Sequence, residues 1–180
     1  GVDFGPDGAM YFVTGGRRTQ SGLYRVRYVG SGSSALGQAA DAEAKRAREL
    51  RRRLEQFHSR RSIEGVGLAW EHLGNDDPWI RHAARVALEH QPVDAWASRA
   101  LEEKDLQTAL SALLALARQG AAGQQDALLI AMPQFSSADM SEAQQLEALR
   151  ILGLSFIRMG KPDDLTTEDL LEALGPLYPA

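Results

Sequence analysis

The chain contains no cysteine in its 180 residues. Disulfide bonds, thiolate zinc sites, iron–sulfur clusters, cysteine nucleophiles and covalent c-type haem are excluded within it, because each needs a cysteine sulfur. It also lacks any apolar run close to the roughly 20 residues that cross a bilayer, and its N-terminus lacks the charged and apolar regions of a signal peptide. If the protein is exported, we expect its signal to lie outside this segment.

An excess of charge of one sign is also lacking. Lys and Arg number 20, Asp and Glu number 24, and the formal net charge is -4. This balance provides no chain-wide attraction for nucleic acid or anionic membranes, so such binding would need a local cluster. Apolar residues make up 44% and charged residues 24%, as in soluble globular proteins, and the length allows one domain or two modules of which one is small.

The first 30 residues predict short strands joined by turns, at 2–4, 9–14 and 23–29. The Gly-Pro-Asp-Gly segment at 5–8 favours a turn, because proline fixes φ while aspartate and glycine tolerate left-handed conformations. Three strands make an incomplete sheet with exposed edges and little core. We therefore expect this meander to depend on strands outside the segment.

A glycine- and serine-rich stretch at 31–41 interrupts all periodicity, as a flexible connector does. The predicted division is a set of terminal β-strands at 1–30, a linker at 31–41 and an α-helical domain at 42–180.

The helical part predicts short helices separated by short loops, which favours antiparallel helix pairs. Capping residues predict helix starts after Asp77 and Ser141 and at Thr167. The glycines expected to end helices are Gly74, Gly120, Gly160 and Gly175. The expected helical spans are 42–58, 63–73, 78–90, 93–103, 106–119, 124–132, 142–159 and 167–174.

Residues 73–88 read Leu-Gly-Asn-Asp-Asp-Pro-Trp-Ile-Arg-His-Ala-Ala-Arg-Val-Ala-Leu. This stretch resembles the second-helix signature of HEAT-like repeats, although Asn75 stands where that family favours aspartate. The matching positions are Ile80, Arg81, Ala84, Ala87 and Leu88. The small alanines would let a neighbouring helix approach closely, and we expect the arginine to reach the loop of an adjacent repeat. The other predicted helix pairs match this signature only weakly. This implies a short array of divergent repeats.

A second resemblance covers the start of the chain. Residues 4–12, Phe-Gly-Pro-Asp-Gly-Ala-Met-Tyr-Phe, and the segment 15–26 are similar to a closing blade of glucose/sorbosone-dehydrogenase-like propellers. Those enzymes resemble quinone-dependent sugar oxidoreductases in fold. Together with residues 84–92, the order of modules resembles large exported planctomycete-type proteins that join such a propeller to HEAT-like repeats and a c-type cytochrome domain.

This resemblance implies a mainly α fold, in which a HEAT-like antiparallel helical-repeat array (an α-solenoid) follows a small antiparallel β meander from a β-propeller blade. It implies a non-catalytic scaffold for protein–protein interaction that links the propeller to a downstream electron-transfer domain. The segment itself would hold no cofactor, whereas the intact protein would use pyrroloquinoline quinone, calcium and haem c. Its partners would be neighbouring domains of the same polypeptide or another protein, in an exported, periplasmic or cell-envelope location.

Two alternatives remain open. The segment could belong to a quinone-dependent sugar or alcohol dehydrogenase whose active site lies outside it, or it could be a HEAT-like nucleic-acid-binding module. The second alternative rests on a basic stretch composed of Lys45, Arg46, Arg48, Arg51, Arg52, Arg53, Arg60 and Arg61. Acidic residues dilute this stretch, and the pairs Glu49–Arg53 and Arg51–Glu55 have the spacing of helix ion pairs. We therefore interpret it first as a solvated helix face and disfavour nucleic acid.

Histidines and tryptophans are weaker candidates for a site. The histidines are His58, His72, His82 and His90, and none are four residues apart, so packing or surface positions are favoured over metal binding. The tryptophans are Trp70, Trp79 and Trp96, which suit seams between helices better than a peptide groove.

Arg17 and Arg18 lie in a glycine-bounded loop and are the best candidates to contact a substrate in the intact protein, with a charged surface turn as the simpler interpretation. The pairs Asp76–Asp77 and Asp163–Asp164 have the position of helix caps rather than of an acid–base dyad. No nucleophile–base pair is evident, and we assign no catalytic, cofactor-binding or metal-binding residue.

Overall fold

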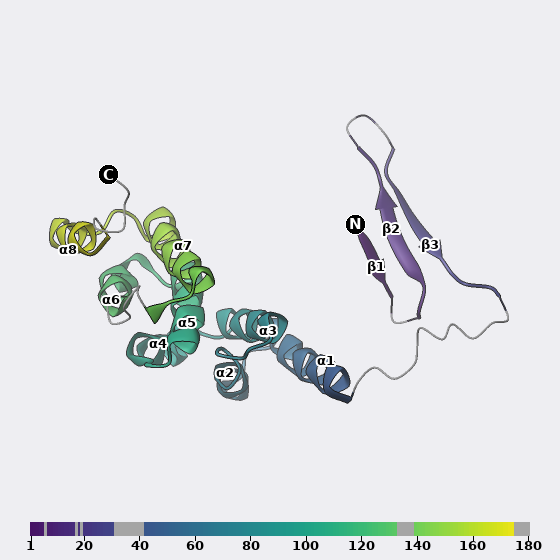
Figure 1. Cartoon of the computed structure of the whole chain (residues 1–180), viewed down its shortest axis with the longest axis horizontal. Helices are drawn as coiled ribbons and strands as arrows, with labels where there is room; N and C mark the ends of the chain where they lie inside the picture. Colours follow the sequence, from purple (N-terminus) through teal and green to yellow (C-terminus); the bar gives the residue numbers. More distant parts are fainter. Residues whose placement is uncertain (6, 17, 19, 31–41, 133–138, 175–180) are drawn as a thin grey trace. The chain divides into compact units, whose positions relative to one another are not determined.

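The computed structural model describes residues 1–5, 7–16, 18, 20–30, 42–132 and 139–174. The chain divides into two compact units, Gly1–Ala40 and Asp41–Ala180. In the described ranges the first unit holds three strands and the second eight α-helices (Figure 1). A mainly helical chain with a small antiparallel sheet is thereby confirmed. The predictions for Pro6, Arg17, residues 31–41 and Gly175 lie outside the described residues.

The first unit is an antiparallel sheet in the order β1-β2-β3, formed by β1 (Val2–Phe4), β2 (Met10–Thr14) and β3 (Gly22–Val26). All three predicted strands are present, although β3 ends at residue 26 rather than 29. Phe12 and Tyr24 are cross-strand partners, and their ring centroids stack 5.2 Å apart. Aromatic pairs of this kind stabilise a sheet that has little core.

Asp7 organises the turn between β1 and β2. Its Oδ1 accepts a hydrogen bond from the backbone N–H of Ala9 at 3.2 Å, and its Oδ2 accepts from the Tyr11 hydroxyl at 2.9 Å and from Nη2 of Arg25 at 2.6 Å. The bond from Ala9 is the main reason why the pKa of Asp7 lies below its usual value. Gly8 has a φ of 73°, the left-handed conformation that the sequence predicts for this turn.

The second unit consists of short helices. They are α1 (Ala42–Glu55), α2 (Ile63–Trp70), α3 (Pro78–Glu89), α4 (Ala97–Glu102), α5 (Leu106–Gln119), α6 (Gln125–Ala131), α7 (Glu142–Met159) and α8 (Asp164–Leu174). Seven of the eight predicted spans contain one of them, the eighth, 167–174, lies within α8, and no strand occurs in 42–132 or 139–174. Within these ranges and the first unit's described residues, no helix is long and apolar enough to cross a membrane.

Local capping chemistry explains several helix ends. Asp77 accepts hydrogen bonds from the N–H groups of the first turn of α3, and Ser141 forms a capping box with Gln144 at the start of α7. Gly120 ends α5, and Gly160 ends α7 with a φ of 105°. These predictions are confirmed.

The predicted start of α8 at Thr167 is wrong. The helix begins at Asp164, because Oδ1 of Asp163 accepts the N–H of Thr166 at 2.6 Å and caps the first turn. The predicted end of α2 at Gly74 is also too late, since the helix ends at Trp70 and a turn follows.

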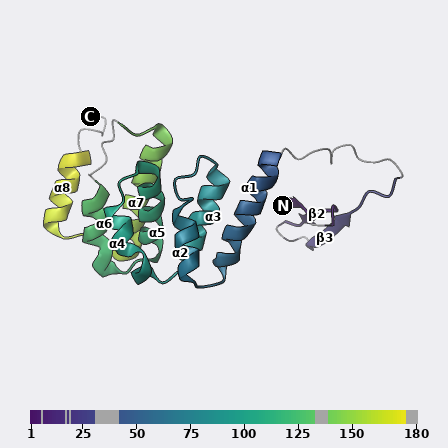
Figure 2. The same ribbon diagram turned by 90° about the horizontal axis from the view of Figure 1, so that it is seen from below.

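The helices of the second unit lie in two layers (Figures 1 and 2). In one layer α1, α3, α5 and α7 pack each against the next, and in the other α4, α6 and α8 do so. The layers are joined by the packing of α2 on α3, α4 on α5 and α6 on α7. The core centres on α5, in which every residue from 109 to 117 is buried.

Candidate functional site

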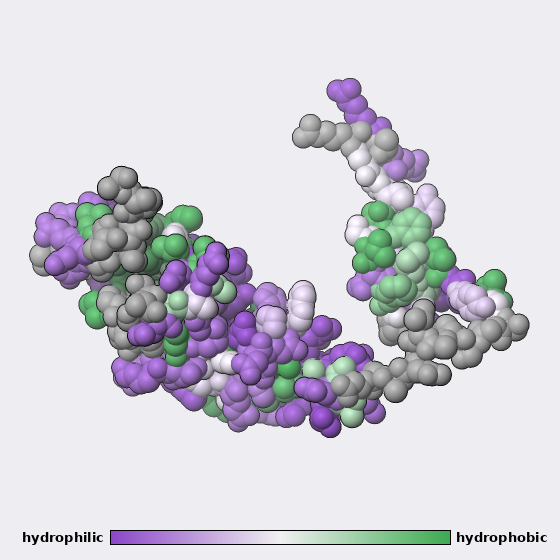
Figure 3. Space-filling model, viewed as in Figure 1, coloured by the Kyte–Doolittle hydropathy of each residue, from purple (hydrophilic) through white to green (hydrophobic). Residues whose placement is uncertain are grey.

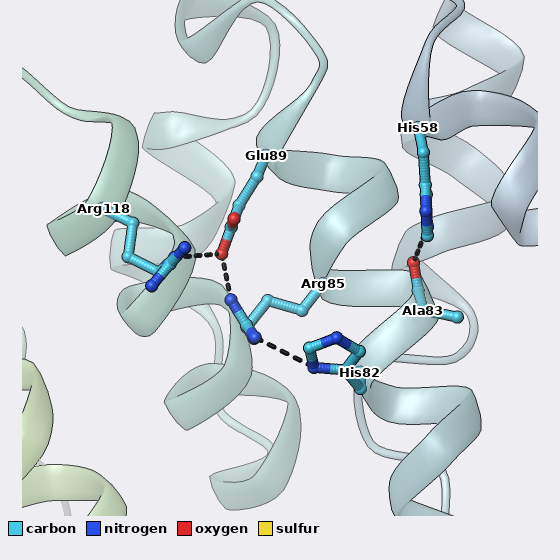
Figure 4. Close-up of polar contacts among 6 residues, drawn as sticks. All are labelled: His58, His82, Ala83, Arg85, Glu89 and Arg118. Atoms are coloured by element: carbon cyan, nitrogen blue, oxygen red, sulfur yellow. Dashed lines mark hydrogen bonds and ion pairs between the residues drawn. The ribbon is translucent and has the colours of Figure 1, made fainter. Parts of the chain in front are cut away.

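Charged side chains meet where α3 packs against α5 (Figure 4). Glu89, the last residue of α3, has a side chain that is only 6% exposed. Its Oε1 pairs with Arg85 one turn earlier and lies 2.9 Å from Nε of Arg118 on α5. Arg85 also donates from Nη2 to Nδ1 of His82 at 3.1 Å. The cluster therefore ties two neighbouring helices of one layer.

The contact between Arg118 and Glu89 is an ion pair without hydrogen-bond geometry. The Nε atom of Arg118 is buried, yet its N–H is not aimed at an acceptor despite the short distance to Glu89. A carboxylate between two guanidinium groups, with no nucleophile among its contacts, is suited to holding helices together rather than to acid–base catalysis.

The histidines of this region serve as hydrogen-bond partners. Burial lowers the pKa of His82, and the positive charge of Arg85 lowers it further. Its Nδ1 accepts from Arg85, which fits the neutral ring. His58 lies in the short helical turn after α1 and contacts α3. Its Nε2 is 2.9 Å from the carbonyl oxygen of Ala83, and its ring stacks on that of His90. In the part of the chain that the structure describes, no group of three His, Asp or Glu side chains is placed to hold a metal ion.

A cavity of about 330 Å³ lies beside this cluster. Its lining residues are Ser59, Arg61, Glu89, His90, Gln91, Pro92, Val93 and Gln119. The buried Gln91 side chain accepts the N–H of Ser62 at 2.7 Å and donates to the carbonyl oxygens of Phe57, Arg60 and Ala87. Its hydrogen-bonding capacity is thus used to hold the chain between α1 and α2, and not to bind a ligand.

A second cavity of about 530 Å³ lies between α1 and the start of α3, lined by Glu43, Arg46, Ala47, Leu50, Gly74, Asn75, Asp76, Asp77 and Ile80. Arg81 donates from Nη1 to the carbonyl oxygens of Asn75 at 2.5 Å and Asp76 at 3.0 Å. The expectation that Arg81 reaches the adjacent repeat is therefore wrong: it binds the loop before its own helix. Asp77 is a cap, as expected.

The basic stretch lies on α1 and the loop after it, and its arginine and lysine side chains are exposed. Arg51 pairs with Glu55 at 3.0 Å, as its spacing predicts. Glu49 and Arg53 form no ion pair, so this part of the prediction is wrong. Exposed pairs on a helix contribute little stability, and the face remains a solvated, positively charged surface.

Two of the three tryptophans fill seams, as predicted. Trp96 is 1% exposed, and Trp70 donates from Nε1 to Glu103 at 2.9 Å. Burial acts to raise the pKa of Glu103, but this bond and backbone N–H groups outweigh it and lower the pKa. The prediction is wrong for Trp79, which is 71% exposed. Trp79 lies one position away from the buried stripe that begins at Ile80, so α3 turns it outward.

Arg18 has a φ of 68° and an exposed side chain in the loop between β2 and β3. A non-glycine residue in the left-handed region is uncommon and marks a tight turn. Its contact with a substrate stays a prediction.

Several residues that organise the second unit were not predicted. The i,i+4 spacing of Arg85 and Glu89 was visible in sequence, but nothing local indicated that Arg118 would join them. Gln91 and Gln125 gave no signal either, although Gln125 donates to the carbonyl oxygens of Ser155 at 3.3 Å and Gly160 at 2.6 Å and so clamps the end of α7.

Comparison with protein-family models, with curated proteins and with solved structures finds no match for this chain.

Proposed function

We propose that residues 42–174 form a HEAT-like helical-repeat scaffold, an α-solenoid without catalytic activity of its own, that docks neighbouring domains. The observation that carries this proposal is the two-layer stacking, in which each odd-numbered helix packs on the next and each is joined to a helix of the other layer. Stacked helix pairs of this kind bury a continuous core and present extended surfaces for partners.

Matching positions in α3 and α5 support a repeat. Asp77 and Asp105 are the N-cap residues of the two helices. At the seventh, tenth and eleventh positions after each cap stand an alanine, an alanine and a leucine, all fully buried. These residues are Ala84, Ala87, Leu88, Ala112, Ala115 and Leu116. Small residues at equal positions allow equal helix separations, as a repeated unit requires.

The scaffold would link a dehydrogenase-like propeller to an electron-transfer domain in an exported protein, and this extension rests on the resemblance of residues 4–12 and 15–26. The exposed apolar side chains of the sheet support it. Val2, Phe4 and Leu23 are each about 70% exposed, and Figure 3 shows hydrophobic surface over the strands. A three-stranded sheet with such faces would be stabilised by packing onto further strands.

An activity assay separates this scaffold from an enzyme. The purified chain is supplied with pyrroloquinoline quinone, calcium, a panel of aldoses and alcohols, and an artificial electron acceptor, beside a known quinone-dependent sugar dehydrogenase as the positive control. We expect no turnover, because three strands cannot enclose a site that needs about four to eight propeller blades. Turnover by this chain would contradict the proposal.

A further inference from the structure

An apolar stripe runs along the outer face of α7. It consists of Leu146, Leu149, Gly153, Phe156 and Ile157, whose spacing places them on one side of the helix. Leu146 is 62% exposed, Leu149 55% and Ile157 82%. Hydrophobic surface is visible over this part of the unit in Figure 3. The opposite side of α7, which includes Ile151, is buried, so α7 has one apolar face inside the unit and one outside.

Gly153 lies in the middle of the stripe, and packing within the chain does not explain it. A Cβ atom added at this position would meet no atom within 4 Å. Glycine inside a helix is less favourable than alanine. A glycine at the centre of an apolar helix face permits close approach of another backbone.

The stripe continues an interface that already exists. When α5 and α7 are aligned by their cap residues, Asp105 and Ser141, Leu110 corresponds to Leu146 and Ala117 corresponds to Gly153. Both α5 residues are fully buried, because α5 has the neighbours α3 and α7 in its layer. In the described ranges α7 has only one neighbour in that layer, α5. The positions of α7 that correspond to buried positions of α5 are therefore not packed against a second helix of the layer.

We propose that the stripe binds the same stripe of a second copy of the chain, with the two α7 helices antiparallel and the two-fold axis at Gly153. Leu149 lies four residues before Gly153 and Ile157 four residues after, so these two positions are symmetric about it, while Phe156 is related in the same way to Arg150. In an antiparallel pair, Leu149 of one copy then faces Ile157 of the other. Such self-complementarity is what an interface between identical surfaces requires.

Head-to-tail stacking of copies does not explain the stripe. The other end of the layer is α1, whose outer face carries Lys45, Arg48 and Arg52. Pressing an apolar face onto these cations would remove their water without providing partners. The charged face of α1 is suited to ending the array, as the polar outer faces of terminal repeats do.

Because the chain has no cysteine, a single introduced thiol reports on the axis. We expect Gly153→Cys to form an intermolecular disulfide on mild oxidation with diamide, which takes two electrons and two protons from two thiols. A disulfide needs Cα atoms roughly 4.4–6.8 Å apart, which only residues near the axis satisfy. The matched control is Gln145→Cys, also exposed on α7 but roughly 24 Å from its counterpart in the antiparallel pair.

Sedimentation of the unmodified chain over a range of concentrations provides the second readout. We expect a monomer–dimer equilibrium whose association weakens about tenfold or more with Ile157→Glu, because the change buries an unpaired carboxylate. Far-UV circular dichroism confirms that the variant is folded. A chain that stays monomeric at every concentration overturns the proposal. So does a dimer that tolerates Ile157→Glu, or equal cross-linking of the two cysteine variants.

Discussion

Replacing Ala84 by leucine tests the helix packing of the second unit at one of its closest contacts. Ala84 is fully buried on α3, which packs against α1, α2 and α5. Because protein interiors are close-packed, a fully buried side chain at such a contact leaves little room for a larger one.

The expected loss is about 1–3 kcal/mol in the free energy of unfolding. Leucine adds three carbon atoms, whose burial in available space would stabilise the fold by about 0.8 kcal/mol each. Protein interiors are packed at the density of organic crystals, so α3 must instead shift away from its neighbours. The lost contacts then exceed the gain from burial.

Urea denaturation followed by circular dichroism at the helix band measures this change. The matched control is Ala143→Leu, the same substitution at an exposed position of α7, for which we expect a change within about 0.5 kcal/mol. The denaturant dependence should be the same in both variants, since the surface exposed on unfolding is unchanged. Equal stability of the Ala84→Leu variant and the unmodified chain would refute the close packing of α3.

Three further outcomes are expected. Asp105→Ala should cost about 0.5–2 kcal/mol in urea denaturation and Asp105→Asn much less, because the cap of α5 is lost only in the first. Hydrogen bonds from Thr108 lower the pKa of Asp105, so the cost of Asp105→Ala relative to the unmodified chain should shrink as the pH falls below 3.8. The lowered pKa of His82 means that the unfolded chain binds its proton more readily, so stability should fall as the pH drops below 6.5, and less so in His82→Asn. Fluorescence anisotropy should show only weak DNA binding by α1 that disappears near physiological salt, whereas a tight, sequence-dependent complex would contradict the scaffold proposal.

The helices could be predicted because their signals are local. Asp77 and Ser141 act through hydrogen bonds to residues within one turn, and Gly160 acts through its own positive φ, so local sequence identifies them. The sequence offers two starts for α8, because Asp163 and Thr167 are both good caps and local chemistry does not choose between them; the structure uses Asp163. Trp79 differs from the prediction for another reason: tryptophan commonly fills a seam between helices, but the offset of Trp79 from the buried stripe at Ile80 places it on the outer side of α3.

The contacts between helices could not be predicted in this way. Arg118 reaches Glu89 only because α5 lies beside α3. Gln91 binds the backbone of Ser62, just before α2, and these two residues are also far apart in the sequence. No periodicity encodes such pairs. The exposed stripe on α7 has helical spacing like a buried one, so the sequence does not tell which of the two apolar faces of that helix lies inside the unit.

Distances between spin labels test the central claim, the order of helices in a stacked array, most directly. Labels on cysteines introduced in pairs at Arg53, Gln119 and Arg158, exposed sites near the ends of α1, α5 and α7, are free of background because the chain has no native cysteine. Neighbouring helices lie roughly 8–10 Å apart, so the pair on α1 and α7 should be separated by about one helix spacing more than the pair on α1 and α5. A 53–158 distance equal to or shorter than the 53–119 distance would contradict the array.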